Sequence, residues 1–201
     1  MAPTRILLAR HGETDWNAVG RWQGHTDRSL TELGRRQAAE LAERLADIEL
    51  DAVYSSDLLR AVETAEPVAK RLGLPLHTLP ELREVDVGTW AGLTRDEVAE
   101  RFPDGFRRWS EWQTGWDGGE TYDEMGKRVV EAILRLAAKH EGGRILVVSH
   151  GGAIRALHAA AAGIDIATFR QLRPVVENAR VTSLLVEDGR LSEAPDEDRE
   201  G

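Results

Sequence analysis

The chain has 201 residues, of which 41% are hydrophobic and 30% are charged, a composition typical of one globular domain. Its 26 Lys and Arg residues against 35 Asp and Glu residues give a net charge of −9, which disfavours general binding to nucleic acid or to an anionic membrane surface. The absence of cysteine excludes disulfides, thiolate nucleophiles and cysteine-ligated metals, and no apolar stretch approaches the roughly 20 residues of a membrane helix. We therefore expect a cytoplasmic protein without nucleic-acid or membrane partners.

Apolar runs and helical patterns alternate along the first half of the chain. We expect these elements: a buried strand at 6–9 that ends at Arg10, a helix behind the N-cap Thr31, a strand at 51–55, a helix at 58–72 that ends at Gly73, and a strand at 74–79. Prolines at 75 and 80 indicate that the ends of the last strand are exposed.

The second half continues the alternation. We expect these elements: helices that start at the capping boxes Thr94 to Glu97 and Thr121 to Glu124, a buried strand at 144–149, a helix through residue 162, and a last strand at 180–187. Residues 191–201 are acidic and lack apolar periodicity, which predicts a disordered tail after a single domain at 1–190.

Alternating strands and helices predict an α/β domain with a largely parallel sheet and helices on both faces. In such sheets ligands bind beyond the carboxyl ends of the strands. Polar segments follow three of the predicted strands, namely Arg10-His11-Gly12, Ser55-Ser56-Asp57 and His150-Gly151-Gly152. We therefore expect two histidines and several arginines near one rim of the sheet.

His11 is the first candidate for chemistry. A neutral imidazole attacks phosphorus and forms a phosphohistidine that water later hydrolyses. It needs one free ring nitrogen and an acceptor on the other, for which a nearby glycine carbonyl is suited. Arg10 and Arg60 offer planar, charged forks for phosphate oxygens. Taken singly, His11 also fits a strand-end cap, and Arg60 also fits a solvated helix residue.

Two further segments carry candidate residues. His150 precedes glycines at a predicted helix start, where backbone N–H groups approach an anion, and it is either a phosphate donor or a buried, hydrogen-bonded histidine. Glu84 is a candidate acid that protonates a leaving alkoxide. Asp86 lies two residues away, and the sequence alone does not separate the two carboxylates, either of which also fits a surface loop.

Together these motifs resemble the histidine phosphatase family, the phosphoglycerate-mutase-like proteins. The resemblance rests on Arg10-His11-Gly12-Glu13-Thr14 with Asn17, Arg60-Ala61 with Thr64-Ala65, Glu84, and Ser149-His150-Gly151-Gly152. It implies a three-layer α/β sandwich around a mixed, mostly parallel sheet flanked by helices.

The resemblance also implies a role for each site residue. His11 is the phosphorylated nucleophile, Glu84 is the proton donor, and the phosphate pocket is formed by Arg10, Arg60 and His150. The substrate side is lined by Asn17, Gln23, Gly24 and Gly151. The resemblance implies no metal and no organic cofactor.

The family divides into mutases, which return the phosphoryl group to substrate, and phosphatases, which pass it to water. The resemblance implies that mutases carry a longer chain with an insertion before the final histidine motif, and 201 residues is too short for it. We expect metal-independent hydrolysis of a small phosphorylated metabolite. The alternatives are a cofactor-dependent phosphoglycerate mutase and a catalytically weak binding or regulatory relative. The pattern is similar to that of glucosyl-3-phosphoglycerate phosphatases, but ribazole-phosphate phosphatases share the same motifs.

Five aromatic residues follow one another at the spacing of one helical face: Phe102, Phe106, Trp109, Trp112 and Trp116. We expect most of them to pack on the core. One or two of the tryptophans are candidates for a wall over the substrate, and an exposed part of the stripe is a candidate homodimer surface.

Other enzyme classes lack their motifs. No serine lies in a Gly-x-Ser-x-Gly elbow, and the six histidines include no helical pair at zinc-binding spacing. A Gly-x-x-x-x-Gly-Lys-Ser/Thr loop is absent, which disfavours a kinase or nucleotide-binding module.

Overall fold

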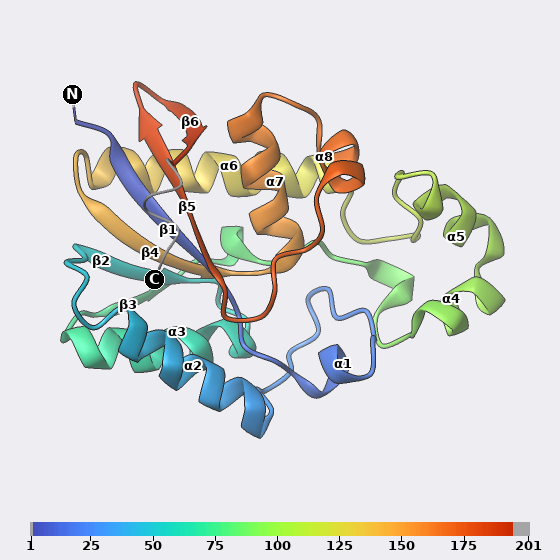
Figure 1. Ribbon diagram of the computed structural model, residues 1–201. Helices are drawn as coiled ribbons and strands as arrows, with labels where there is room; N and C mark the ends of the chain where they lie inside the picture. Colours follow the sequence, from blue (N-terminus) through green and yellow to red (C-terminus); the bar gives the residue numbers. More distant parts are fainter. Residues whose placement is uncertain (1, 195–201) are drawn as a thin grey trace.

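A computed structural model describes residues 2–194 of the chain (Figure 1). The strands are β1 (Thr4–Arg10), β2 (Ala52–Ser55), β3 (Leu76–Thr78), β4 (Arg144–Ser149), β5 (Val181–Glu187) and β6 (Arg190–Glu193). The helices are α1 (Asp15–Ala18), α2 (Glu32–Arg44), α3 (Leu59–Leu72), α4 (Arg95–Arg101), α5 (Pro103–Ser110), α6 (Tyr122–Lys139), α7 (Gly151–Ala162) and α8 (Ile166–Leu172). Within this described range, no helix is long and apolar enough to cross a membrane.

The strands form one mixed sheet in the order β3-β2-β4-β1-β5-β6. The first four are parallel to one another, whereas β5 is antiparallel to both β1 and β6. Arg10 at the end of β1 pairs with Ser149 of β4, and Ser55 of β2 pairs with Val148. The polar segments that follow β1, β2 and β4 therefore start at one rim of the sheet, as predicted.

Helices cover both faces of the sheet, with α6 and α7 on one side and α2 and α3 on the other (Figure 1). Side chains alternate between the faces along a strand. Ile6 and Leu8 of β1 accordingly pack with residues of α6 and α7, and Leu7 and Ala9 pack with residues of α2 and α3. The predicted three-layer α/β sandwich is confirmed.

The predicted helix ends are also confirmed. The side chains of Thr31, Thr94 and Thr121 accept hydrogen bonds from the first turns of α2, α4 and α6. Gly73 ends α3 in the left-handed region, at φ +66°. The strand predicted at 74–79 is shorter in the structure, and it lies on the sheet edge.

The start of the predicted disordered tail is instead part of the sheet. A turn at Asp188 and Gly189, both with positive φ, returns the chain so that β6 pairs with β5. Edge pairing depends on backbone hydrogen bonds, so β6 forms with one packed leucine, Leu191, and without apolar periodicity. The prediction was wrong for residues 191–193, and residues 195–201 of the predicted tail lie outside the described residues.

The five aromatic residues do not share one helical face. Helix α5 ends at Ser110, and Trp112 beyond it adopts φ +68°, so the helical spacing of the sequence is interrupted. Trp116 is buried, whereas the side chain of Trp112 is 39% exposed. The short helices α1 and α8 were not predicted.

Candidate active site

The predicted site residues gather at the carboxyl ends of β1 and β4. A cavity of about 650 Å³ opens at this rim, and its walls include the predicted residues Arg10, His11, Asn17, Gln23, Gly24, Arg60, Glu84 and Gly151. His150 is fully buried beneath this wall, and its ring centroid lies 5.2 Å from that of His11. In residues 2–194, no cluster of three or more His, Cys, Asp or Glu side chains is arranged to hold a metal ion.

His11 is held in one orientation. Its Nδ1 lies 2.7 Å from the carbonyl oxygen of Gly12, which assigns the proton to Nδ1 and leaves the lone pair of Nε2 free. Burial, together with the positive charges of Arg60 and Arg10, lowers the pKa of His11 well below 6.5. The imidazole is therefore neutral at neutral pH, as a nucleophile requires.

Arg60 sets the tautomer of His150. Its Nε donates a 3.3 Å hydrogen bond to Nδ1 of His150, so the proton of that imidazole is on Nε2. This Nε2 is buried, with no partner in the described part of the chain. The rest of the Arg60 guanidinium donates to the carbonyl oxygens of Gly24 and Thr26 at 2.8 and 2.9 Å. Burial lowers the pKa of Arg60 to about 10, so the group stays charged at neutral pH.

Arg10 offers a second unpartnered donor. Its Nη1 donates to the carbonyl oxygen of Val176 at 2.7 Å, whereas its Nε is buried and has no partner among residues 2–194. A buried donor without an acceptor is costly, and a bound phosphate oxygen would supply that acceptor. Arg10 and His150 thus present polar hydrogens on the side of His11 where an anion would bind.

The structure separates the two candidate carboxylates. Glu84 lines the cavity, and its oxygens accept hydrogen bonds from the backbone N–H groups of Val85 and Gly152, both at 2.9 Å. Asp86 lies outside the cavity wall and accepts from the backbone N–H of Gly88 at 3.0 Å. Glu84 is therefore the carboxylate positioned to meet a substrate.

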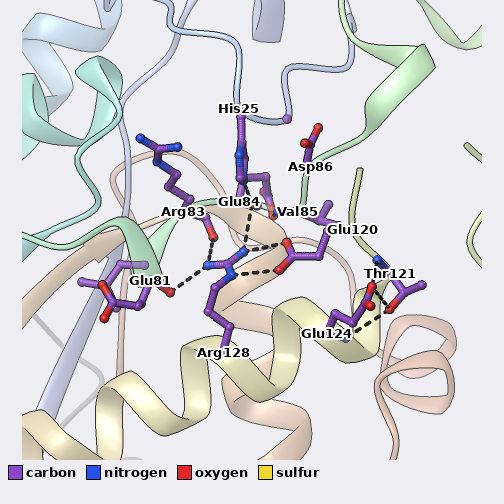
Figure 2. Close-up of polar contacts among 12 residues, drawn as sticks. His25, Glu81, Arg83, Glu84, Val85, Asp86, Glu120, Thr121, Glu124 and Arg128 are labelled. Atoms are coloured by element: carbon purple, nitrogen blue, oxygen red, sulfur yellow. Dashed lines mark hydrogen bonds and ion pairs between the residues drawn. The ribbon is translucent and has the colours of Figure 1, made fainter. Parts of the chain in front are cut away.

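Arg128 of α6, which sequence analysis did not single out, fixes the loop that carries Glu84 (Figure 2). Its guanidinium donates to three backbone carbonyls of this loop, those of Glu81, Arg83 and Glu84, at 2.7, 3.1 and 3.3 Å. The opposite edge of the guanidinium pairs with Glu120 at 2.7 Å. The half-buried ion pair thus connects α6 to the backbone beside the candidate acid.

Aromatic and basic residues also line the cavity. Trp109 and Trp112 line it, as expected for one or two of the tryptophans, and Trp22 packs edge-on against Trp109 at 5.3 Å. Arg155 and Arg170 also line it, and neither was predicted. Arg155 follows Gly151 by four residues on α7, so helical spacing was the signal that pointed to it, whereas Arg170 belongs to the unpredicted α8.

Comparisons with known proteins agree with this geometry. The family model described as "Histidine phosphatase superfamily (branch 1)" matches residues 6–194. A metal-independent phosphoserine phosphatase of Arabidopsis thaliana is 43% identical over 160 residues, which is 77% of this chain and 67% of the relative. The solved structure of YhfR from Bacillus stearothermophilus is 35% identical with a TM-score of 0.88, and the match covers 96% of each chain. A mycobacterial glucosyl-3-phosphoglycerate phosphatase, solved with VO3, is 32% identical with a TM-score of 0.86, over 96% of this chain and 97% of that one.

Proposed function

We propose, because the chain belongs to the histidine phosphatase superfamily (branch 1), that it hydrolyses small phosphorylated metabolites through a phosphohistidine on His11, without a metal ion. The chain is a phosphoric monoester hydrolase, as its relatives are. One observation carries the assignment of His11: its imidazole is held neutral, with Nε2 free, beside unpartnered buried donors on Arg10 and His150.

The reaction has two steps. In the first, Nε2 of His11 attacks phosphorus while the bond from phosphorus to the ester oxygen breaks, and protonated Glu84 gives its proton to the leaving alkoxide. Arg10, Arg60 and His150 stabilise the charge on the three phosphoryl oxygens. In the second step the Glu84 carboxylate takes a proton from water as that water attacks the phosphohistidine, which releases phosphate and restores His11.

The substrate belongs to the small phosphorylated metabolites. The relatives named above are phosphatases of phosphoserine and of glucosyl-3-phosphoglycerate, and a cavity of about 650 Å³ is large enough for either type of compound. We assign hydrolysis as the main reaction because these relatives are phosphatases. Isomerisation, the reaction of the alternative mutase, is an outcome of the test.

The test is phosphate release from a panel of phosphomonoesters in EDTA, by the wild type, His11→Ala and His77→Ala. His77 is an exposed histidine of β3 outside the cavity, so it serves as the control. We expect His11→Ala to abolish release and His77→Ala to leave it unchanged. We also expect the wild type and His77→Ala, but not His11→Ala, to form an acid-labile phosphoenzyme during turnover. Substantial phosphate release by His11→Ala would overturn the assignment of His11 as the nucleophile. Loss of phosphate release by the wild type in EDTA would overturn metal independence. Isomerised phosphoglycerate without phosphate release would make the protein a mutase.

A further inference from the structure

The cavity has a strong excess of positive charge in a chain whose net charge is −9. Six arginines line it, Arg10, Arg21, Arg60, Arg155, Arg170 and Arg173, and Glu84 is the one carboxylate among its described lining residues. Arg10 and Arg60 are beside His11, and Arg21 is paired with Glu97. A phosphoryl group at His11 therefore does not account for the positive charge of the other three arginines, Arg155, Arg170 and Arg173.

Of the remaining arginines, Arg170 is buried and Arg155 is half-buried. The Nε of each is buried without a hydrogen-bond partner in residues 2–194, and neither side chain forms an ion pair there. Arg170 is 5% exposed, its guanidinium lies over the ring of Tyr122 at 3.8 Å, and its Nη1 donates to the carbonyl oxygen of Trp112 at 3.0 Å. Burial lowers the pKa of both arginines, although each remains charged at neutral pH.

Their position relative to the phosphate pocket follows from α7. Arg155 lies four residues, about 6 Å along the axis, beyond Gly151, where the helix begins beside Arg10. Arg155 and Gly151 are therefore on the same face of α7, towards the cavity. A small ester whose phosphoryl group lies at His11 would extend towards Arg155.

We propose that Arg155 and Arg170 form a second anion subsite, which binds a carboxylate of the substrate while its phosphoryl group is bound at His11. The inference rests on the proposed function and narrows it to phosphorylated hydroxy or amino acids. A carboxylate suits the site because the Nε of each arginine has no partner in the described chain and, together with an Nη group, forms a planar fork that matches two carboxylate oxygens. Phosphoserine and phosphoglycerate, the acids in the relatives' names, both contain such a carboxylate.

The test compares esters that differ in the carboxylate. O-phosphoserine is paired with phosphoethanolamine, and 3-phosphoglycerate is paired with glycerol 3-phosphate; each second member lacks the carboxylate. We expect Arg155→Met to lower kcat/KM roughly 10- to 100-fold for the carboxylate esters and at most about 2-fold for their partners. Arg155→Lys should restore part of the loss, because it keeps the charge without the planar fork. Arg36→Met, at an exposed arginine of α2, is the control.

The ratio within each pair does not depend on the folded fraction, because a destabilised variant loses both activities equally. Equal losses for both members would overturn the subsite and make Arg155 a structural residue. A preference of the wild type for propane-1,3-diol bisphosphate over phosphoserine would overturn the carboxylate assignment.

Calorimetric binding of O-phosphoserine and phosphoethanolamine to His11→Ala, with and without Arg155→Met, tests the subsite independently of turnover. p-Nitrophenyl phosphate carries no second anion, so its hydrolysis tests the proposed phosphatase activity without the subsite. His11-dependent hydrolysis of this ester, together with equal binding of O-phosphoserine and phosphoethanolamine, would support the phosphatase and overturn the subsite.

Discussion

The backbone N–H of Gly152 donates a 2.9 Å hydrogen bond to the carboxylate of Glu84, which joins the first turn of α7 to the loop that carries the candidate acid. The pair is close enough that a Cβ on residue 152 would collide with Oε1 of Glu84. A side chain at residue 152 would therefore force the carboxyl group of Glu84 to move, so the glycine allows the carboxyl group to lie where it does.

Gly152→Ala should displace Glu84 and impair protonation of the leaving group. We expect kcat for alkyl phosphates to fall by about 10- to 100-fold, a part of the roughly 10²- to 10⁴-fold that a general acid contributes, and kcat for p-nitrophenyl phosphate to fall much less. Steady-state rates on both esters measure the effect. Gly126→Ala on α6 is the matched control, because the nearest atom to its new Cβ is at an ordinary contact distance of 3.7 Å. Equal losses on both esters would show that residue 152 acts on phosphate binding instead.

Glu84→Gln should keep the shape of the site but remove the transferable proton. We expect a loss of about 10²- to 10⁴-fold on alkyl phosphates and a small loss on esters with activated leaving groups, which leave without protonation. Asp86→Asn is the control, since Asp86 lies outside the cavity and its replacement still accepts from Gly88. A series of substituted phenyl phosphates measures the dependence on the leaving group. The same dependence in Glu84→Gln and the wild type would eliminate Glu84 as the acid.

Much of the site could be predicted because it follows the strands. Apolar runs identify β1 and β4, parallel pairing brings their carboxyl ends together, and His11 and His150 come directly after those ends. The residues alone could not decide between Glu84 and Asp86, and only the family resemblance named Glu84. The structural choice depends on Gly152, which is distant in sequence and whose N–H meets only one of the two carboxylates.

The unpredicted parts of the structure depend on contacts between distant segments. Arg170 is on α8, a helix of 7 residues, too short to show a clear apolar period. Its guanidinium is held by the ring of Tyr122 and the carbonyl of Trp112, neither of which is near it in the sequence. Strand β6 likewise forms because β5 offers an edge, and nothing in its own four residues specifies a strand.

Arg60→Ala should weaken the binding of inorganic phosphate and vanadate by about 1.5–3 kcal/mol, the contribution typical of a hydrogen bond to a charged group. The arginine is 1% exposed and also holds the carbonyls of Gly24 and Thr26, so the melting temperature should fall as well. Calorimetric titration with vanadate measures the first effect and thermal unfolding measures the second. Arg36→Ala, at an exposed position of α2, should change neither. Unchanged vanadate affinity with a lowered melting temperature would leave Arg60 a purely structural role.

The two buried histidines should make the fold sensitive to acid. Burial, followed by the positive charge of Arg60, lowers the pKa of both His11 and His150 well below 6.5 in the folded protein, whereas in the unfolded chain they titrate near 6.5. Below that pH the unfolded chain binds protons that the folded protein does not, so the free energy of unfolding falls as the pH drops from 6.5 towards the folded pKa. The stabilisation is fully present above 6.5, and each histidine contributes a slope of up to about 1.4 kcal/mol per pH unit.

Denaturant unfolding of the wild type and of His11→Asn between pH 5 and 8 measures this slope. Asparagine does not titrate, so we expect the variant to lose about half of the slope that the two histidines produce between pH 5 and 6.5, with no difference in slope above pH 7. His77→Asn, at an exposed histidine of β3, is the control and should follow the wild type at every pH. Parallel curves for the wild type and His11→Asn would mean that His11 titrates normally in the folded protein, which would contradict its lowered pKa and the acid sensitivity expected from it.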